Sequence, residues 1–222
     1  MSKTRFLAIA LLLLMPIARA QDLPQIDGHM HLGVATCASS QCHGSAVART
    51  GANVLQSEYV SWTNDDPHAG AFQTLTTTES AAIAMRLGLG NAAEADECLD
   101  CHADHVPPAR RGERFQLSDG VGCEACHGGA ENWLVAHYND PDAGHEDNVA
   151  AGLYPADLRS RATLCLSCHL GTEDKFASHS MMAAGHPRLT FELDTFTELW
   201  RLAGNPPHFI ADDDYAARKA EI

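Results

Sequence analysis

Residues 123–127 read Cys-Glu-Ala-Cys-His, and variants of this short pattern recur along the chain. Each of the eight cysteines belongs to such a pair, and a histidine directly follows the second cysteine every time. The pairs with their histidines are Cys37/Cys42/His43, Cys98/Cys101/His102, Cys123/Cys126/His127 and Cys165/Cys168/His169. So regular an arrangement indicates one kind of site that is repeated along the chain.

The C-x-x-C-H spacing is that of covalent haem attachment. The two thiols add across the vinyl groups of one porphyrin edge, and the next imidazole becomes the proximal ligand of the iron. The sequence therefore predicts four covalently attached haem c groups with the proximal ligands His43, His102, His127 and His169. The first motif has four residues between its cysteines, and we expect this insert to bulge away while both sulfurs still reach the vinyls.

Two other roles of cysteine pairs are less consistent with this pattern. Paired cysteines can hold zinc through four thiolates, but zinc does not require a histidine after every second cysteine. Disulfides between cysteines three residues apart are strained. With haem at every pair, no cysteine remains for a bridge or for a catalytic thiol.

The composition indicates which classes of partner the chain can bind and what kind of core it can build. Acidic residues outnumber basic ones by 29 to 15, which gives a formal charge of −14 and argues against nucleic acid and against an anionic membrane surface. We expect redox protein partners with basic docking patches instead. Aromatic residues make up only 6 % of the chain. The sequence thus predicts a mainly α fold with extensive loops, built around a haem core.

The first twenty residues have the pattern of a secretory signal peptide. Lys3 and Arg5 precede an apolar run over residues 6–17, and Ala18-Arg19-Ala20 matches a small-x-small cleavage site. The apolar run is shorter than the ~20 residues that a membrane span needs. We therefore expect a signal peptide over 1–20 and a tetrahaem cytochrome domain over 21–222, exported to the periplasm or the extracellular space without stable membrane insertion.

The other histidines decide whether the second axial face of each iron is occupied. Two imidazoles give a low-spin iron suited to electron transfer, whereas an empty face allows a substrate to bind. The candidate distal ligands are His68, His137, His179 and His186. His68 follows Pro67, which suits the first turn of a helix capped by Asp65 or Asp66.

The remaining histidines are weaker candidates. His105 lies three residues after His102, before two prolines, and is expected at the surface or against a propionate. His29 and His31 could ligate a haem in this chain or in a neighbouring one. His145 and His208 lie in turn-like segments.

Hydrophobic periodicity predicts helices over 54–62, 79–87, 131–137 and 188–202, and no strand. The last of these is expected to be a core helix that packs on a haem. If the segment from His179 to His186 stays helical through Gly185, its two histidines lie two turns apart on one face.

The chain resembles the tetrahaem cytochrome c-554 family over roughly residues 35–170. The most specific match is Gly-Val-Gly-Cys-Glu-Ala-Cys-His-Gly-Gly over 120–129, with a histidine ten residues beyond the proximal one. A second match is Trp62 followed by His68. The resemblance implies near-parallel, edge-overlapping haem pairs, with His137 opposite His43 and His68 opposite His127.

The chain also departs from the family pattern. Its first motif is longer, and no histidine suited to the fourth haem precedes Cys165. The downstream segment with His179 and His186 could supply ligands to the haems of His102 and His169, in either order.

The sequence favours an electron-transfer protein over an enzyme. One alternative is a reductase of a small nitrogen or sulfur oxide at a five-coordinate haem, most plausibly that of His102. Another is a homo-oligomer or haem filament, with His29 or His31 ligating across the interface.

Overall fold

The computed structural model describes residues 22–49, 54–139, 144–155, 157–189 and 191. The predicted signal peptide, almost all of the predicted helix over 188–202, and His208 lie outside these residues. The described part consists of helices and loops without a strand, and its one isolated bridge joins His31 to Arg111. The mainly α prediction is confirmed to this extent. No helix in the described ranges is both long and apolar enough to cross a bilayer.

The helices are short and closely follow the cysteine motifs. The α-helices are α2 (Glu58–Asp65), α3 (Ala71–Thr74), α4 (Thr78–Leu87), α5 (Asp96–His102), α6 (Cys123–His127), α7 (Leu134–Asn139), α8 (His145–Ala150), α9 (Leu158–His169) and α10 (His179–Ala183). Single 3₁₀ turns are η1 (Val34–Thr36), η2 (Pro67–Gly70), η3 (Pro108–Arg110) and η4 (Leu117–Asp119). Helices α5, α6 and α9 each end on the histidine of a motif.

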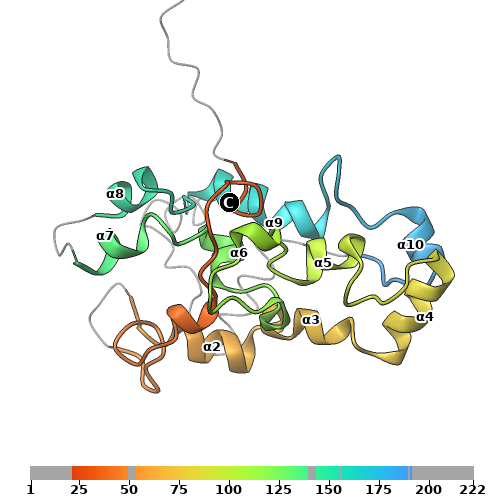
Figure 1. Ribbon diagram of the computed structural model, residues 1–222, viewed down its shortest axis with the longest axis horizontal. Helices are drawn as coiled ribbons and strands as arrows, with labels where there is room; N and C mark the ends of the chain where they lie inside the picture. Colours follow the sequence, from red (N-terminus) through yellow and green to blue (C-terminus); the bar gives the residue numbers. More distant parts are fainter. Residues whose placement is uncertain (1–21, 50–53, 140–143, 156, 190, 192–222) are drawn as a thin grey trace, which may run out of the picture.

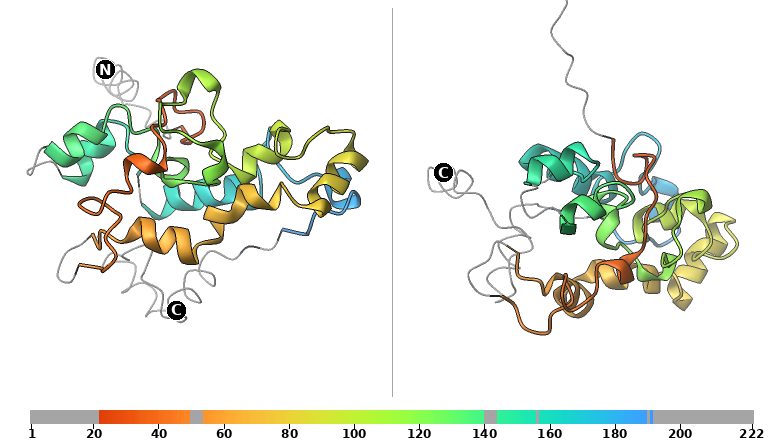
Figure 2. Two further views of the ribbon diagram at one scale, coloured as in Figure 1. Left: turned by 60° about the horizontal axis from the view of Figure 1, so that its bottom comes forward. Right: turned by 60° about the vertical axis from the view of Figure 1, so that its left-hand side comes forward.

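The elements are spread along one long axis. Helices α7 and α8 lie at one end of the molecule, α4 and α10 lie together at the other, and α5, α6 and α9 lie between them (Figure 1). A view turned by 60° keeps this arrangement (Figure 2). The motif-bearing helices therefore occupy the middle of the molecule.

The helix predicted over 79–87 is confirmed as α4, where Thr77 accepts a hydrogen bond from the Ser80 amide and Gly88 ends the helix at a φ of 72°. The helix predicted over 54–62 was wrong at its start. Gln56 has a φ of 57°, and the Glu58 carboxylate accepts hydrogen bonds from the amides of Leu55 and Gln56. These amides are thus held outside the helix, which begins at Glu58. The helix predicted over 131–137 is present as α7, but it begins at Leu134 and ends at Asn139.

The apolar core of the described residues is small. Leu75, Ala84, Ala92, Leu99 and Ala103 form one buried cluster, which is built by α4, α5 and the residues next to them. Three of its five members are alanines, so the cluster provides little volume. Partly buried apolar side chains pack against it, namely Phe72, Leu89, Ala93, Cys98 and Leu117.

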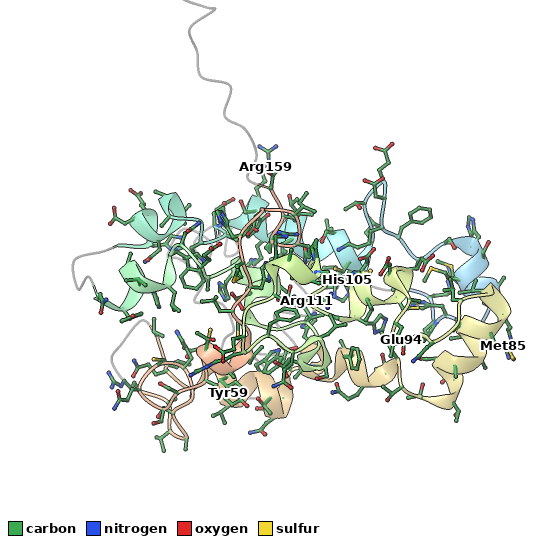
Figure 3. The ribbon with its side chains drawn as sticks, in the orientation of Figure 1. Tyr59, Met85, Glu94, His105, Arg111 and Arg159 are labelled. Carbon is green, nitrogen blue, oxygen red and sulfur yellow. The ribbon has the colours of Figure 1, made fainter. Side chains whose placement is uncertain are left out.

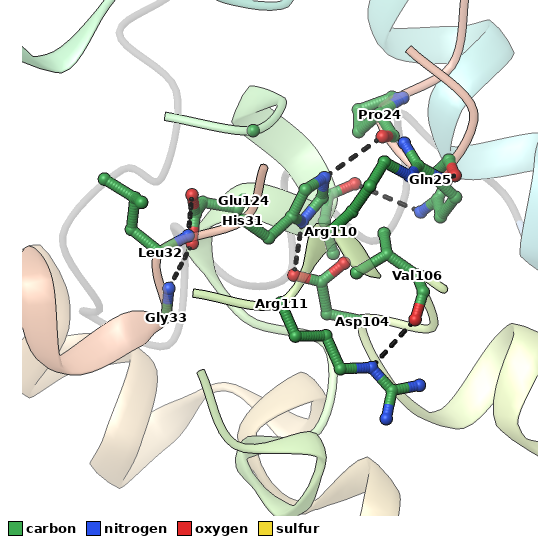
Figure 4. A network of polar contacts seen from close by, with 12 residues as sticks. Pro24, Gln25, His31, Leu32, Gly33, Asp104, Val106, Arg110, Arg111 and Glu124 are labelled. Atoms are coloured by element: carbon green, nitrogen blue, oxygen red, sulfur yellow. Dashed lines mark hydrogen bonds and ion pairs between the residues drawn. The ribbon is translucent and has the colours of Figure 1, made fainter. Parts of the chain in front are cut away.

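Buried polar contacts hold the N-terminal segment onto α6 (Figure 4). The Glu124 carboxylate accepts hydrogen bonds from the amides of Leu32 at 2.7 Å, Gly33 at 2.6 Å and Ala130 at 2.8 Å. Glu124 itself is only 2 % exposed. The second residue of the third motif thus holds the N-terminal segment and the residues after α6 in place.

His31 is completely buried beside this contact. Its Nδ1 lies 2.8 Å from the Asp104 carboxylate, and its Nε2 lies 3.2 Å from the Pro24 carbonyl oxygen. Both ring nitrogens are therefore engaged inside the protein. The expectation that His31 could ligate a haem is wrong for this reason.

Candidate haem centres

The first motif adopts a different local structure from the other three. Cys37 follows η1, and the longer insert forms a turn in which the Cys42 amide donates to the Ser39 carbonyl at 2.9 Å. The His43 amide then donates to the Cys37 carbonyl at 3.2 Å. Because the turn returns the chain to Cys37, the insert is absorbed without separating the two ends of the motif.

His43 faces His137 from α7. Their ring centroids are 6.2 Å apart, and the ring planes differ by only 12°. The edge of Trp133 packs against His137 with centroids 5.7 Å apart. On the other side, His43 Nδ1 lies 3.0 Å from the Glu58 carboxylate at the start of α2. The two histidines are therefore each held by a neighbour while they face each other.

His102 faces His186. Their centroids are 6.3 Å apart with an interplanar angle of 83°. His102 Nδ1 lies 2.9 Å from the Thr74 hydroxyl and 3.1 Å from the Ala71 carbonyl oxygen. His186 Nδ1 lies 2.8 Å from the Pro187 carbonyl oxygen. Both imidazoles are thus oriented by uncharged oxygens.

Helix α10 ends at Ala183, and Gly185 has a φ of 113°. The helical face that was expected to align His179 with His186 therefore does not exist. Arg86 donates to the Ala184 carbonyl at 2.7 Å and fastens this turn to α4. His179 begins α10 and is exposed, and within the described residues no other imidazole stacks with it.

His68 faces His169, the last residue of α9. Their centroids are 5.9 Å apart at an interplanar angle of 86°. The resemblance implied instead that His68 lies opposite His127, so this pairing is corrected. Asp66 caps η2 by accepting from the His68 amide at 3.0 Å and also contacts His68 Nδ1 at 2.8 Å. The Phe191 ring stacks on His169 with centroids 4.3 Å apart.

A glycine allows the His68 turn to lie against the third motif. Gly120 has a φ of 77°, and a Cβ there would lie 2.7 Å from the His68 carbonyl oxygen. That oxygen instead accepts a hydrogen bond from the Val121 amide at 3.1 Å. Trp62 in α2 donates from Nε1 to the Val121 carbonyl at 3.1 Å. The Trp62–His68 element of the sequence is therefore fixed to the third motif.

The spacing of these pairs fits two imidazoles that bind one iron from opposite faces. With metal–nitrogen bonds of about 2 Å, the two ring centroids are about 6 Å apart. The observed separations are 5.9, 6.2 and 6.3 Å. Four of these histidines form their hydrogen bonds through Nδ1, namely His43, His68, His102 and His186. The other ring nitrogen, Nε2, is then available to bind the metal, as in other sites with histidine ligands.

A further observation also suits haem. The indole Nε1 of Trp133 is buried, and within the described residues no acceptor pairs with it. An indole nitrogen can only donate. A haem propionate is an acceptor that would satisfy it. The residues around the His43–His137 pair therefore fit the cofactor that the cysteines predict.

Burial also favours the ligating protonation state of several histidines. It lowers the pKa of His102, His137 and His169, so these imidazoles are neutral and can bind a metal. His68 is different because its hydrogen bond with Asp66 raises its pKa despite burial. The Asp66 carboxylate thus holds the proton on Nδ1.

Cysteines of different motifs lie close enough to shift one another's pKa. Cys37 of the first motif meets Cys123 of the third, and Cys101 of the second meets Cys168 of the fourth. The contact with Cys101, together with Lys175 Nζ at 3.3 Å, lowers the pKa of Cys168 to about 5. Burial raises the pKa of Cys126 to about 12. The attachment points of separate motifs are therefore close in space.

One residue of the site, Glu58, could not be found from the sequence, whereas His105 and His29 were weaker candidates whose contacts the structure now gives. Glu58 lies fifteen residues after His43 in a different element, so no local pattern links the two. His105 Nδ1 contacts Asp100 at 2.6 Å and its Nε2 lies 3.5 Å from Asp96, which places it between two carboxylates. His29 Nδ1 lies 2.8 Å from the Asn132 amide.

A comparison with protein families finds one match. The family model described as cytochrome c554 and c-prime matches residues 36–128. This stretch contains the first three motifs and His68, and it ends before His137, the fourth motif and His186. Searches of curated proteins and of solved structures find no match. Residues 36–128 are thus similar to the cytochrome c554 and c-prime family, and this match supports a c-type cytochrome of electron transfer with covalently bound haem c.

Proposed function

We propose that this protein is an exported tetrahaem c-type cytochrome that carries single electrons between redox protein partners. The observation that carries the proposal is the set of three imidazole pairs at 5.9 to 6.3 Å. Each pair joins the histidine of one motif to a histidine outside the motifs. Six-coordinate irons of this kind exchange electrons without binding a substrate. The third motif repeats the same attachment chemistry at His127.

The cysteine contacts support an ordered row of four attachment sites. The first site adjoins the third through Cys37 and Cys123, and the second adjoins the fourth through Cys101 and Cys168. Cys126 of the third site lies within electrostatic range of Cys168 of the fourth. The row therefore runs first, third, fourth, second. It follows the long axis from the α7 end to the α4 and α10 end (Figure 1).

The charge of the chain supports protein partners that present basic patches. The excess of acidic residues gives attraction over long distances and raises association rates at low salt. Removal of residues 1–20 takes away Lys3, Arg5 and Arg19 and makes the mature chain more acidic still. We expect electron transfer to a basic partner to slow as the ionic strength rises.

The alternative functions lose support from particular contacts. A reductase at the haem of His102 requires an open iron, and the His186 ring, whose centroid lies 6.3 Å from that of His102, supports a second ligand there instead. A filament ligated through His31 requires that side chain at the surface, and it is completely buried.

The proposal is tested by producing the full chain in a bacterial host that attaches haem to cytochromes c. We expect a secreted product that begins at Gln21 and carries four haems by intact mass. Reductive coulometry is expected to find four electrons per chain, and a Cys165→Ala/Cys168→Ala variant to lose one haem and one electron. A wild-type product with fewer haems, or one that is colourless, would overturn the proposal.

A further inference from the structure

The paired histidines differ in the charge of their hydrogen-bond acceptors. His43 Nδ1 contacts the Glu58 carboxylate at 3.0 Å, and His68 Nδ1 contacts the Asp66 carboxylate at 2.8 Å. The pair at the other end of the row is different, because His102 and His186 contact only neutral oxygens in the hydrogen bonds described above. Two of the three pairs thus have a carboxylate behind one ligand, and the third does not.

A carboxylate behind an imidazole changes the iron that the imidazole binds. It draws the Nδ1 proton toward itself, so Nε2 becomes a stronger donor to the metal. A stronger donor stabilises ferric iron, which carries more charge than ferrous iron, and thereby lowers the reduction potential. A carbonyl oxygen does the same more weakly because it carries no net charge.

The exposure of the two carboxylates to water determines how strongly each one polarises its imidazole. The Asp66 side chain is only 13 % exposed, whereas that of Glu58 is 40 % exposed and is more screened by water. Glu58 is held in place by the amides of Leu55 and Gln56, at 2.8 and 3.2 Å. Asp66 is held by the His68 amide. Both carboxylates therefore stay directed at their imidazoles.

We propose that Glu58 and Asp66 give the row of haems a direction by lowering the potentials of the His43 and His169 centres below that of the His102 centre. The inference rests on the proposed electron-transfer function and adds the site from which electrons leave the protein. Electrons would collect on the haem of His102, beside α4 and α10. Met85, which is 72 % exposed on α4, and Glu94 mark the surface of this end (Figure 3).

The test uses Glu58→Gln and Asp66→Asn in the complete haem-loaded protein. Each change removes one negative charge and keeps an amide oxygen near the imidazole. The matched controls are Glu79→Gln in the exposed first turn of α4 and Asp65→Asn, the exposed neighbour of Asp66. Potentials are measured by spectroelectrochemistry. EPR at fixed potentials identifies the His43 centre, and the two near-perpendicular centres are told apart because Asp66→Asn is expected to shift only that of His169. The near-parallel rings of His43 and His137 are expected to give a different signal from the two near-perpendicular pairs.

We expect each test variant to shift the reduction equilibrium of its own centre about tenfold toward the reduced form. For a one-electron couple this is about 59 mV upward. The controls should leave the potentials unchanged. In the wild-type protein the centre of His102 should have the highest potential of the three.

Unchanged potentials in a variant that retains all its haems and its low-spin signals would overturn this inference and leave the proposed function intact. So would a wild-type His43 centre whose potential is higher than those of both near-perpendicular centres, a result that needs no variant to fold. A wild-type protein with too few haems would instead contradict the proposed function itself.

Discussion

Replacing Glu124 by alanine should strongly destabilise the haem-loaded protein. Glu124 is 2 % exposed, and its carboxylate accepts from the backbone amides of Leu32 and Gly33 in the distant N-terminal segment and of Ala130 just after α6. Each hydrogen bond to a charged group contributes about 1.5–3 kcal/mol, and each buried amide left without an acceptor costs about 1–3 kcal/mol. Burial also raises the pKa of Glu124, so the buried charge offsets part of the gain. The expected net loss in the free energy of unfolding is about 3–5 kcal/mol.

The assay is guanidinium unfolding followed by the Soret band and by far-UV circular dichroism. The control is Glu131→Ala, which removes an exposed carboxylate with one 3.1 Å contact to the same N-terminal segment at Met30. Glu124→Gln keeps one acceptor oxygen and should lie between wild type and Glu124→Ala. If Glu124→Ala destabilises the protein no more than Glu131→Ala does, the buried contact does not hold the N-terminal segment.

Two other variants test contacts of particular histidines. His186→Ala should convert one haem to a high-spin form that binds cyanide, while His179→Ala leaves the visible spectrum unchanged. Equal effects of the two variants would refute the His102–His186 pairing. His31→Gln should reduce stability more at pH 6 than at pH 9. Burial lowers the pKa of His31, but its contact with Asp104 outweighs this and raises the pKa overall, so its contribution is complete below about pH 6.5 and disappears as pH rises through the raised value. A loss that is independent of pH, measured by thermal unfolding, would contradict this.

The local features of the chain could be predicted because short sequence patterns determine them. Helix α4 follows from its periodicity and its Thr77 cap, and the capped turn at His68 follows from Asp66 and Pro67. The cysteine motifs likewise predict covalent haem attachment, since the two thiols and the proximal imidazole lie close together in the chain.

The contacts between side chains of distant elements could not be predicted from the sequence. His68 and His169 are separated by about a hundred residues, and their rings come together only in the folded chain. The alignment of His179 with His186 failed because Gly185 ends the helical path with a positive φ. The His43–Glu58 contact depends on where α2 begins, which the capping of Leu55 and Gln56 sets rather than hydrophobic periodicity.

EPR of the fully oxidised protein tests most directly whether pairs of imidazoles ligate the haem irons. Near-parallel axial rings give a rhombic low-spin signal, whereas near-perpendicular rings give a signal with one large g value. The angles of 12°, 83° and 86° predict one rhombic centre and two large-g centres for these three pairs. High-spin signals that account for two or more haems would contradict the account, because at least one of the pairs would then leave its iron open.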